Sequence, residues 1–242
     1  AVDGELVLKE ATRRSFLRRS LTLGGLAMLT GCSLVDEASV DTALSRISRI
    51  NDDVQGWLFD PNRLAPTYPE SMITRPFPFN AYYGEDEIRE IEESSYRLEV
   101  TGLVADRRQW TLRELRAMPQ IEQVTRHICV EGWSAIGKWG GASFASFLRR
   151  AGADLSAKYV GFKCADDYFT SIDMATALHP QTVLALTYDG QPLPPKYGFP
   201  MKLRMPTKLG YKNPKHIQAI FVTNIYPGGY WEDQGYNWFG GS

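Results

Sequence analysis

The sequence Arg126-His127-Ile128-Cys129-Val130-Glu131-Gly132-Trp133-Ser134, which continues to Lys138-Trp139-Gly140-Gly141, combines a strand-like pattern with a cysteine. The pattern predicts a strand over residues 120–130 that delivers Cys129 to its end. Two side chains that can be cationic precede the cysteine, and cations lower the pKa of a thiol and favour the reactive thiolate. Gly132, Gly140 and Gly141 are expected to let the backbone approach a large bound group.

Two other interpretations of this region stand beside the chemical one. A free cysteine is among the most buried residue types and usually only packs, so Cys129 could be purely structural. Residues 132–138 also fit the first seven positions of a phosphate-binding P-loop. The eighth position should carry Ser or Thr to hold magnesium. Because it is Trp139 here, the sequence argues against a nucleotide site.

The order Arg-His-x-Cys-Val-Glu-x-Trp-Ser, followed by a Trp-Gly pair, resembles the molybdopterin-binding domain of the sulfite oxidase family. It looks closest to the exported branch, the catalytic subunit of periplasmic protein-methionine-sulfoxide reductase, and the likeness extends from residue 79 to residue 242. The resemblance implies a molybdenum-molybdopterin cofactor with Cys129 as its thiolate ligand, and thiolates suit soft metal centres. Arg126 and His127 are then the catalytic candidates that place charge behind the ligand.

The same resemblance assigns further contacts to the cofactor. Residues 79–84 resemble the first pterin-contacting loop, and residues 192–204 and 208–215 resemble the segments that hold the pterin and its phosphate. An anion needs cations and free backbone N–H groups, which lysines and glycines in these segments can offer. The positions that match are Asn80, Tyr83, Gly84, Cys164, Tyr197, Lys202, Asn213, Pro214 and Lys215.

Three of these positions depart from the exported branch. Tyr197 stands in place of Asn, Lys202 in place of Arg, and Cys164 in place of a Thr near the metal. A lysine cannot make the planar, bidentate contact of an arginine. These changes put the substrate in doubt more than the cofactor. Lys208 and Lys212 also lie in the phosphate segment, but a solvated basic face explains them equally well.

Composition bounds the class of protein. The chain has 242 residues, 43% hydrophobic and 23% charged, with a net charge of -1. These values fit a globular protein with a sizeable core and give no drive toward nucleic acid. Its 3 cysteines and 3 histidines form no Cys-x-x-Cys pair and no cluster. The pattern therefore argues against iron–sulfur clusters, zinc ribbons and attached haem.

Residues 1–32 are expected to be an export signal. Thr12–Arg18 match the twin-arginine pattern, and the apolar run Leu21–Leu29 is too short to span a bilayer. Leu29-Thr-Gly-Cys32 resembles a lipoprotein box, which predicts lipidation of Cys32 and a location on the periplasmic or cell-surface side of the membrane. Residues 33–78 are predicted to form an extended, proline-rich arm, with a short helix within residues 36–49.

Residues 79–242 are predicted to form one α+β domain with mixed, strand-rich sheets, because strict βαβ alternation is absent. Thr111, Ser143 and Asp173 are typical N-caps of short helices. Strands are expected over residues 96–102, 120–130, 158–164, 182–188, 201–205 and 217–225, with a turn at Asp189-Gly190.

The expected function is the reduction of S-oxides, such as methionine sulfoxide in exported proteins. The mouth of the site is expected to be aromatic, with Tyr82, Tyr83, Trp133, Trp139 and Tyr197 near motif positions. Electrons would come from a membrane partner such as a haem protein, and we expect a monomer. Two alternatives stay open: oxidation of a small sulfur oxyanion, as in sulfite oxidases, and a non-enzymatic lipoprotein that keeps the fold.

Overall fold

The computed structural model of the protein describes residues 37–242. The chain divides into two compact units, with the boundary inside helix α2 (Glu37–Leu58), between Ile47 and Ser48. Among the described residues, the first unit contributes only the beginning of α2. The second unit, Ser48–Ser242, holds both sheets. The predicted twin-arginine signal and Cys32 lie outside the described residues.

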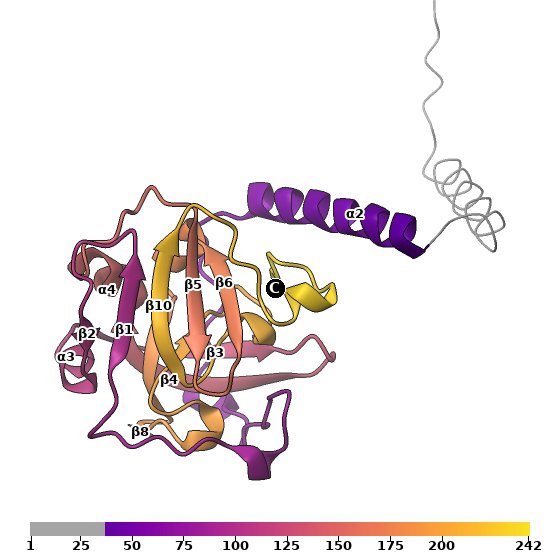
Figure 1. The fold of residues 1–242 in the computed structure, drawn as a ribbon. Helices are drawn as coiled ribbons and strands as arrows, with labels where there is room; N and C mark the ends of the chain where they lie inside the picture. The colour runs from indigo at the N-terminus through magenta and orange to yellow at the C-terminus, as the bar shows by residue number, and fades with distance from the viewer. Residues whose placement is uncertain (1–36) are drawn as a thin grey trace, which may run out of the picture. The chain divides into compact units, whose positions relative to one another are not determined.

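Two sheets form the frame of the second unit (Figure 1). One has the order β2-β1-β10-β5-β6 and is mixed, because β1 and β10 are parallel while the other neighbours are antiparallel. The other has the order β3-β4-β7-β8, with β9 also paired to β7, and is antiparallel throughout. The predicted α+β class with mixed sheets is therefore confirmed. The strands are β1 (Leu98–Gly102), β2 (Gln109–Trp110), β3 (Gln120–Ile128), β4 (Ser134–Ser143), β5 (Tyr159–Cys164), β6 (Phe169–Asp173), β7 (Val183–Tyr188), β8 (Gln191–Pro192), β9 (Lys202–Arg204) and β10 (Ile217–Thr223).

Three short helices begin where their caps predict. They are α3 (Leu112–Arg116), α4 (Phe144–Arg150) and α5 (Met174–Leu178). Thr111 and Glu114 form a capping box, in which each side chain accepts the other residue's backbone N–H. The side chains of Ser143 and Asp173 accept the N–H of Ser146 and Thr176 at 3.3 and 2.7 Å. Each cap satisfies a backbone donor that the first helical turn leaves free.

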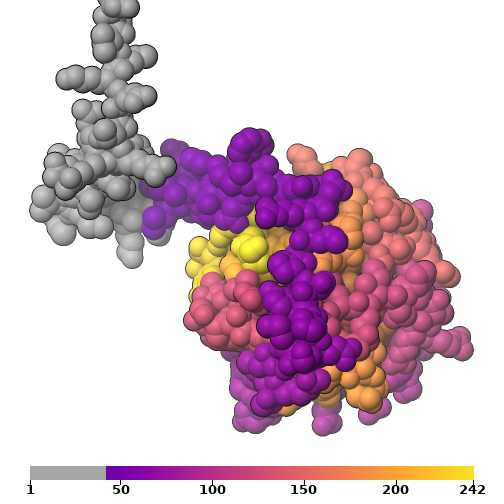
Figure 2. Space-filling view, turned by 180° about the vertical axis from the view of Figure 1, so that it is seen from behind, coloured from indigo at the N-terminus to yellow at the C-terminus, as the bar shows by residue number. Residues whose placement is uncertain are grey.

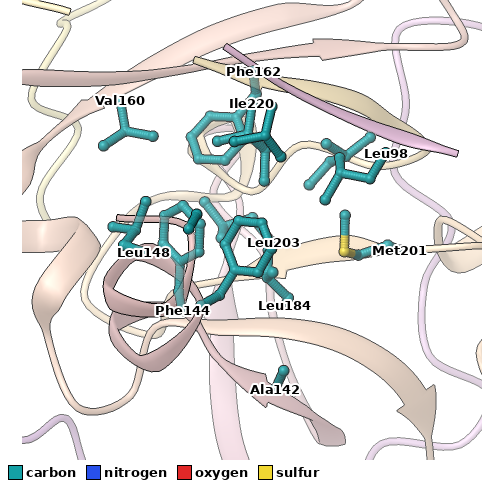
Figure 3. Close-up of a cluster of buried hydrophobic side chains, with 14 of the residues drawn as sticks. Leu98, Ala142, Phe144, Leu148, Val160, Phe162, Leu184, Met201, Leu203 and Ile220 are labelled. Atoms are coloured by element: carbon teal, nitrogen blue, oxygen red, sulfur yellow. The ribbon is translucent and has the colours of Figure 1, made fainter. Parts of the chain in front are cut away.

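The main core lies between the two sheets and against α4 (Figure 3). Val160, Phe162 and Ile220 come from the mixed sheet, Leu203 from the antiparallel sheet and Phe144 from α4, and all are fully buried. A second, aromatic core covers another part of the antiparallel sheet; its buried members are Phe77, Ala135, Trp139, Ala185, Tyr188, Leu193 and Tyr197. The two cores fix both faces of the sheet that carries Cys129.

The arm over residues 59–78 is extended and runs along the face of the domain that Figure 2 shows. Tyr68 N donates to Val124 O of β3 at 3.0 Å, and Thr74 N donates to Ile136 O of β4 at 2.9 Å. The preceding helix α2 is longer than the short helix predicted from the sequence. No helix among residues 37–242 has the length and apolar character needed to cross a membrane.

Of the glycines after Cys129, Gly132 has a φ of 94° and its approach to a bound group stays a prediction, whereas Gly140 and Gly141 do not have the predicted role. Gly140 and Gly141 lie in β4, and a Cβ on Gly141 would sit 1.9 Å from the carbonyl oxygen of Leu184 in β7. They allow two strands to approach each other, so the predicted approach to a large bound group is wrong for this pair. Lys138 lies in the same strand and forms ion pairs with two glutamates, so these residues do not form a phosphate loop.

Candidate cofactor site

Cys129 stands at the point where β3 ends. Its backbone N–H donates to Trp133 O at 2.9 Å, and the N–H of Gly132 donates to Cys129 O at 3.1 Å. Side chains alternate along a strand, so His127 and Cys129 share one face of the sheet. The turn after β3 therefore holds the Cys129 thiol in place, with only 7% of the residue exposed.

A pocket that is open to solvent surrounds this thiol, with about 710 Å³ of empty space when the solvent at its mouth is included. Segments far apart in the sequence form its wall: the loop before β1, the turn after β3, the β5–β6 hairpin and two segments on either side of β10. The lining residues are Asn80, Ala81, Tyr82, Cys129, Val130, Glu131, Asp166, Tyr168, Gly210, Tyr211, Asn213, Pro214, Lys215, Trp231 and Tyr236.

The mouth of the pocket is aromatic, but mostly through other residues than those predicted. Of the expected set, Tyr82 lines the pocket, whereas Trp139 and Tyr197 are buried in the aromatic core. The ring of Tyr82 stacks on that of Tyr230 at 4.7 Å, and Tyr230 contacts the neighbouring Trp231. Sequence reasoning missed the aromatic residues of the pocket outside the motifs, which are Tyr168, Tyr211, Trp231 and Tyr236.

The environment of the Cys129 thiol differs from the prediction. Burial raises its pKa, and the carboxylate of Glu131, 3.6 Å from Sγ, raises it further. Arg126 points to the other face of β3 and lies over the ring of Tyr68 at 5.2 Å, and burial lowers the pKa of His127. The expected lowering of the thiol pKa by these two residues is therefore wrong for the cofactor-free protein.

Three cations are buried beside the pocket. Lys202, Arg204 and Lys215 are 2%, 0% and 8% exposed, and none of the ion pairs among residues 37–242 involves them. Burial lowers the pKa of Lys202, which Lys215 and Arg204 lower further, and burial lowers that of Lys215 to about 8. Since isolated buried charge is costly, this cationic cluster calls for a bound anion.

Neighbouring groups hold the cationic cluster in a fixed geometry. The guanidinium of Arg204 donates to Arg126 O at 2.6 Å and to Thr125 Oγ1 at 3.1 Å. Asn213 Oδ1 accepts from Arg204 Nη1 at 3.3 Å and from a backbone N–H at 2.7 Å. Gly198 has a φ of 115°, and a Cβ there would lie 2.9 Å from the side chain of Lys215. The glycine is required for this close packing.

Two buried histidines also have ring nitrogens without a hydrogen-bond partner among the described residues. Neither ring nitrogen of His127 forms a hydrogen bond, although the residue is fully buried. A Cβ on Gly210 would lie 2.7 Å from its Nε2. In His216 only Nδ1 is bonded, to Phe199 O at 2.6 Å, and Nε2 has no partner. Buried polar atoms without partners are uncommon and mark places where a ligand can bind.

These features fit a molybdopterin. The pocket has a thiol that can become a metal ligand in its wall. A cationic cluster suited to a phosphate and polar atoms available to a pterin ring lie beside it. Within residues 37–242, no three His, Cys, Asp or Glu side chains converge on a possible metal position. Cys129 is the residue that would hold a molybdenum ion in this pocket.

The remaining predicted contacts divide into two groups. Asn80, Asn213, Pro214 and Lys215 line the pocket with Cys129. Tyr83 does not line this pocket, but its hydroxyl donates at 3.1 Å to Asp166, which does.

Several predicted residues lie outside the wall of the pocket. Gly84 begins a 3₁₀ turn and donates to Glu87 at 3.0 Å, and the Tyr197 hydroxyl donates to Phe77 O at 2.8 Å. Cys164 ends β5 and is buried beside the pocket. For these three the structure shows packing or capping contacts, and their assignment to the cofactor stays a prediction.

Lys208 and Lys212 belong to a separate network. Lys212 forms an ion pair with Glu232, and Lys208 Nζ donates to Phe239 O at 2.9 Å and lies 3.5 Å from Asp173. Both lysines thus hold the segment after β10 against the domain. Their charges already have partners in the protein, so neither is needed for a phosphate.

Comparison with known proteins identifies the family of this chain. Residues 85–231 match the family described as "Oxidoreductase molybdopterin binding domain". The chain therefore belongs to the oxidoreductase molybdopterin-binding domain family. It is a molybdopterin-dependent oxidoreductase of the sulfite oxidase type, and its cofactor is molybdenum-molybdopterin.

Individual relatives support the assignment. A protein of Azospira oryzae named "Putative protein-methionine-sulfoxide reductase subunit YedZ1" is 72% identical over 99% of this chain and 96% of its own length. The MsrP catalytic subunit of protein-methionine-sulfoxide reductase from Xanthomonas axonopodis is 32% identical over 49% of this chain and 42% of its own. The sulfane dehydrogenase SoxCD of Paracoccus pantotrophus shares the fold, with a TM-score of 0.54, 19% identity and coverage of 57% of this chain and 40% of its own.

The role of Cys129 can be tested against the second buried cysteine. We expect Cys129→Ser to keep the fold but to lose the visible absorption of a sulfur–molybdenum bond and at least ~100-fold of the activity. Cys164→Ala should retain both, because Cys164 does not line the pocket. Metal analysis and absorption spectra of both variants check this. Normal turnover and an unchanged spectrum in Cys129→Ser would contradict the assignment.

The cost of the cationic cluster should appear in the pH dependence of stability. The pKa of Lys215 falls from 10.5 in the unfolded chain to about 8 in the fold. Between these values the unfolded chain binds more protons, so this group makes the cofactor-free protein more stable as pH rises from 8 to 10. Urea unfolding at both pH values measures the effect. Lys215→Met should remove about 1–3 kcal/mol of the rise, whereas the exposed Lys163→Met should leave it unchanged.

Proposed function

We propose that this protein is an exported molybdenum enzyme that reduces S-oxides, such as methionine sulfoxide in proteins, with electrons from a membrane partner. The observation that carries this proposal is the chemistry of the pocket wall. Aromatic rings dominate it, two carboxylates (Glu131 and Asp166) lie in it, and the only cation lining it within residues 37–242 is Lys215. A neutral, polarisable S-oxide suits such a wall.

The same wall disfavours a small dianion such as sulfite. Sulfite would be repelled by Glu131 and Asp166 and would be bound best by arginine forks. Arg204 is fully buried, and its Nη1 and Nη2 groups already donate to neighbouring residues. The cationic cluster is therefore better matched to the phosphate of the cofactor than to a substrate. The wall thus favours the reductase over the oxidase.

Reduction of an S-oxide consumes two electrons and two protons and releases a sulfide and water. The bound cofactor supplies the two-electron exchange of an oxygen atom. The protein must bring protons to the oxygen and keep bulk water away. Asp166 accepts hydrogen bonds from Tyr83 Oη at 3.1 Å and Tyr168 N at 3.3 Å. Burial raises the pKa of Tyr83 and keeps it protonated, so this pair can hold a proton at the pocket.

The names of the relatives support the substrate and the partner. The Azospira and Xanthomonas proteins are both named for protein-methionine-sulfoxide reductase, and both are named as subunits. A subunit of a reductase works with a second component, which we propose is the membrane electron donor. An open, aromatic mouth would admit a methionine sulfoxide side chain that belongs to a protein.

Export and anchoring follow from the sequence before residue 33. The twin-arginine pattern and the Leu-Thr-Gly-Cys box predict that the folded protein crosses the membrane and is lipidated at Cys32. A lipid anchor would hold the enzyme beside a membrane donor and raise its effective concentration there. The proposed location is the periplasmic or cell-surface side of the membrane.

A substrate panel tests the direction of the reaction. With reduced viologen dye as the donor, we expect turnover of methionine sulfoxide and dimethyl sulfoxide. Sulfite with an electron acceptor should react at least ~10-fold more slowly, because the carboxylates in the wall repel it. Trimethylamine N-oxide serves as the non-sulfur control. Faster turnover of sulfite than of every S-oxide would reject the reductase proposal in favour of the oxidase.

Mass spectrometry of the protein from native membranes tests the anchor. We expect a mature chain that begins at Cys32 and carries acyl groups, because the lipoprotein box places cleavage directly before this cysteine. Cys32→Ser should abolish the added mass. Recovery of membrane-bound protein with residues 1–31 still attached would argue against this processing.

A further inference from the structure

Helix α2 attaches to the domain through its polar side. Within Ser48–Ser242, Asp52 Oδ1 accepts the N–H of Phe239 at 2.7 Å, and Gln55 Oε1 accepts the N–H of Gly241 at 3.1 Å. Directly after the helix, the ring of Phe59 contacts that of Phe239 at 5.7 Å. The helix itself thus contacts the domain mainly through hydrogen bonds from Asp52 and Gln55 to main-chain groups. An apolar residue at either position could not form these bonds.

The apolar side of the same helix faces away from the domain. Ile50 is 62% exposed, Val54 47%, Trp57 83% and Leu58 66%. Their spacing of four, three and one residues places them on one face of an α-helix. We call these four residues the apolar face. A surface helix normally buries such a face against its own core, and a contiguous exposed one marks an interaction surface.

We propose that the apolar face of α2 lies on the surface of a lipid bilayer, inserted among zwitterionic headgroups. The helix is polar on the opposite side and does not qualify as a membrane span, so it suits the plane of the interface. Trp57 stands at the C-terminal end of the apolar face, and tryptophan favours the headgroup region.

The sequence before the helix indicates that the apolar face contacts lipid and not a second copy of the chain. Cys32, the predicted lipidation site, precedes Glu37 by five residues. Five extended residues span only about 17 Å, so an acylated Cys32 would keep the start of α2 within reach of the membrane. This step rests on the proposed lipid anchor. A single acyl chain binds membranes marginally, and a second apolar signal makes the attachment stable.

The charges of the helix define the kind of membrane surface. The sequence of the helix has a net charge of -2, because two basic residues, Arg46 and Arg49, stand against four acidic ones: Glu37, Asp41, Asp52 and Asp53. The helix therefore has no cationic excess that would recruit acidic lipids. Binding must come from burial of apolar side chains, and phosphatidylcholine should suffice.

Quenching of Trp57 by brominated phosphatidylcholine tests the proposal. The full chain with Cys32→Ser is mixed with vesicles of this lipid. The substitution prevents acylation of residue 32, so an acyl chain there cannot contribute to membrane binding. Because residues 21–29 are also apolar, the readout is the part of the quenching that disappears in Trp57→Phe. We expect such quenching, and Ile50→Ser with Val54→Ser should weaken vesicle binding by this measure about tenfold or more.

The matched control carries Asn51→Ser and Asp53→Ser, which add two serines to the same turn without removing apolar surface. It should bind as the parent does, and added phosphatidylserine should not be required. Absence of Trp57-dependent quenching, or equal binding of both serine pairs, would reject the proposal. The proposal would also be rejected if light scattering without vesicles showed a dimer that dissociates when Ile50 and Val54 are changed to serine. If Cys32 proves unacylated while Trp57 is still quenched, only the lipid anchor fails.

Discussion

Positive charge buried without an ion pair is the constraint on which this structure depends. Lys202, Arg204 and Lys215 approach one another in a region from which water is largely excluded, and Lys215 and Arg204 lower the pKa of Lys202. Such an arrangement costs free energy in the cofactor-free protein. The cost is offset when an anion binds, so cofactor binding and stability of the fold are thermodynamically linked. Asn213 accepts a hydrogen bond from Arg204, and Lys215 packs closely against Gly198, so both residues help to position the cluster.

Local signals in the sequence predicted much of the fold. The caps at Thr111, Ser143 and Asp173 act within one turn, and the helices begin where they indicate. The glycines of β4 were misjudged because their function depends on Leu184 in another strand. The position of Arg126 was foreseeable, since alternation along β3 places it on the face opposite to Cys129. Trp231 and Tyr236 could not be predicted, because distant contacts such as the Lys212–Glu232 pair bring their segment to the pocket.

Some residues of the pocket wall lie inside the family match and others lie outside it. The match covers residues 85–231 and includes Cys129 and the cationic cluster. Asn80 and Tyr82 precede it, and Tyr236 follows it, yet all three line the pocket. Cys129 and the cationic cluster thus lie within the common domain, whereas other residues of the pocket wall come from the flanking segments. Proteins that share the domain can differ in substrate by changing these flanks, because function resides in the site and not in the fold.

The wide sequence separation of the pocket residues sets an order of events during biosynthesis. Asn80 and Cys129 leave the ribosome long before Lys215 and Tyr236, although all four line one pocket. Contacts between such distant residues form late, because closing long loops costs conformational entropy. A nascent chain thus presents the thiol before the cations and aromatic rings that surround it exist. Insertion of the cofactor must therefore be a post-translational event, timed by completion of the fold and not by emergence of its metal ligand.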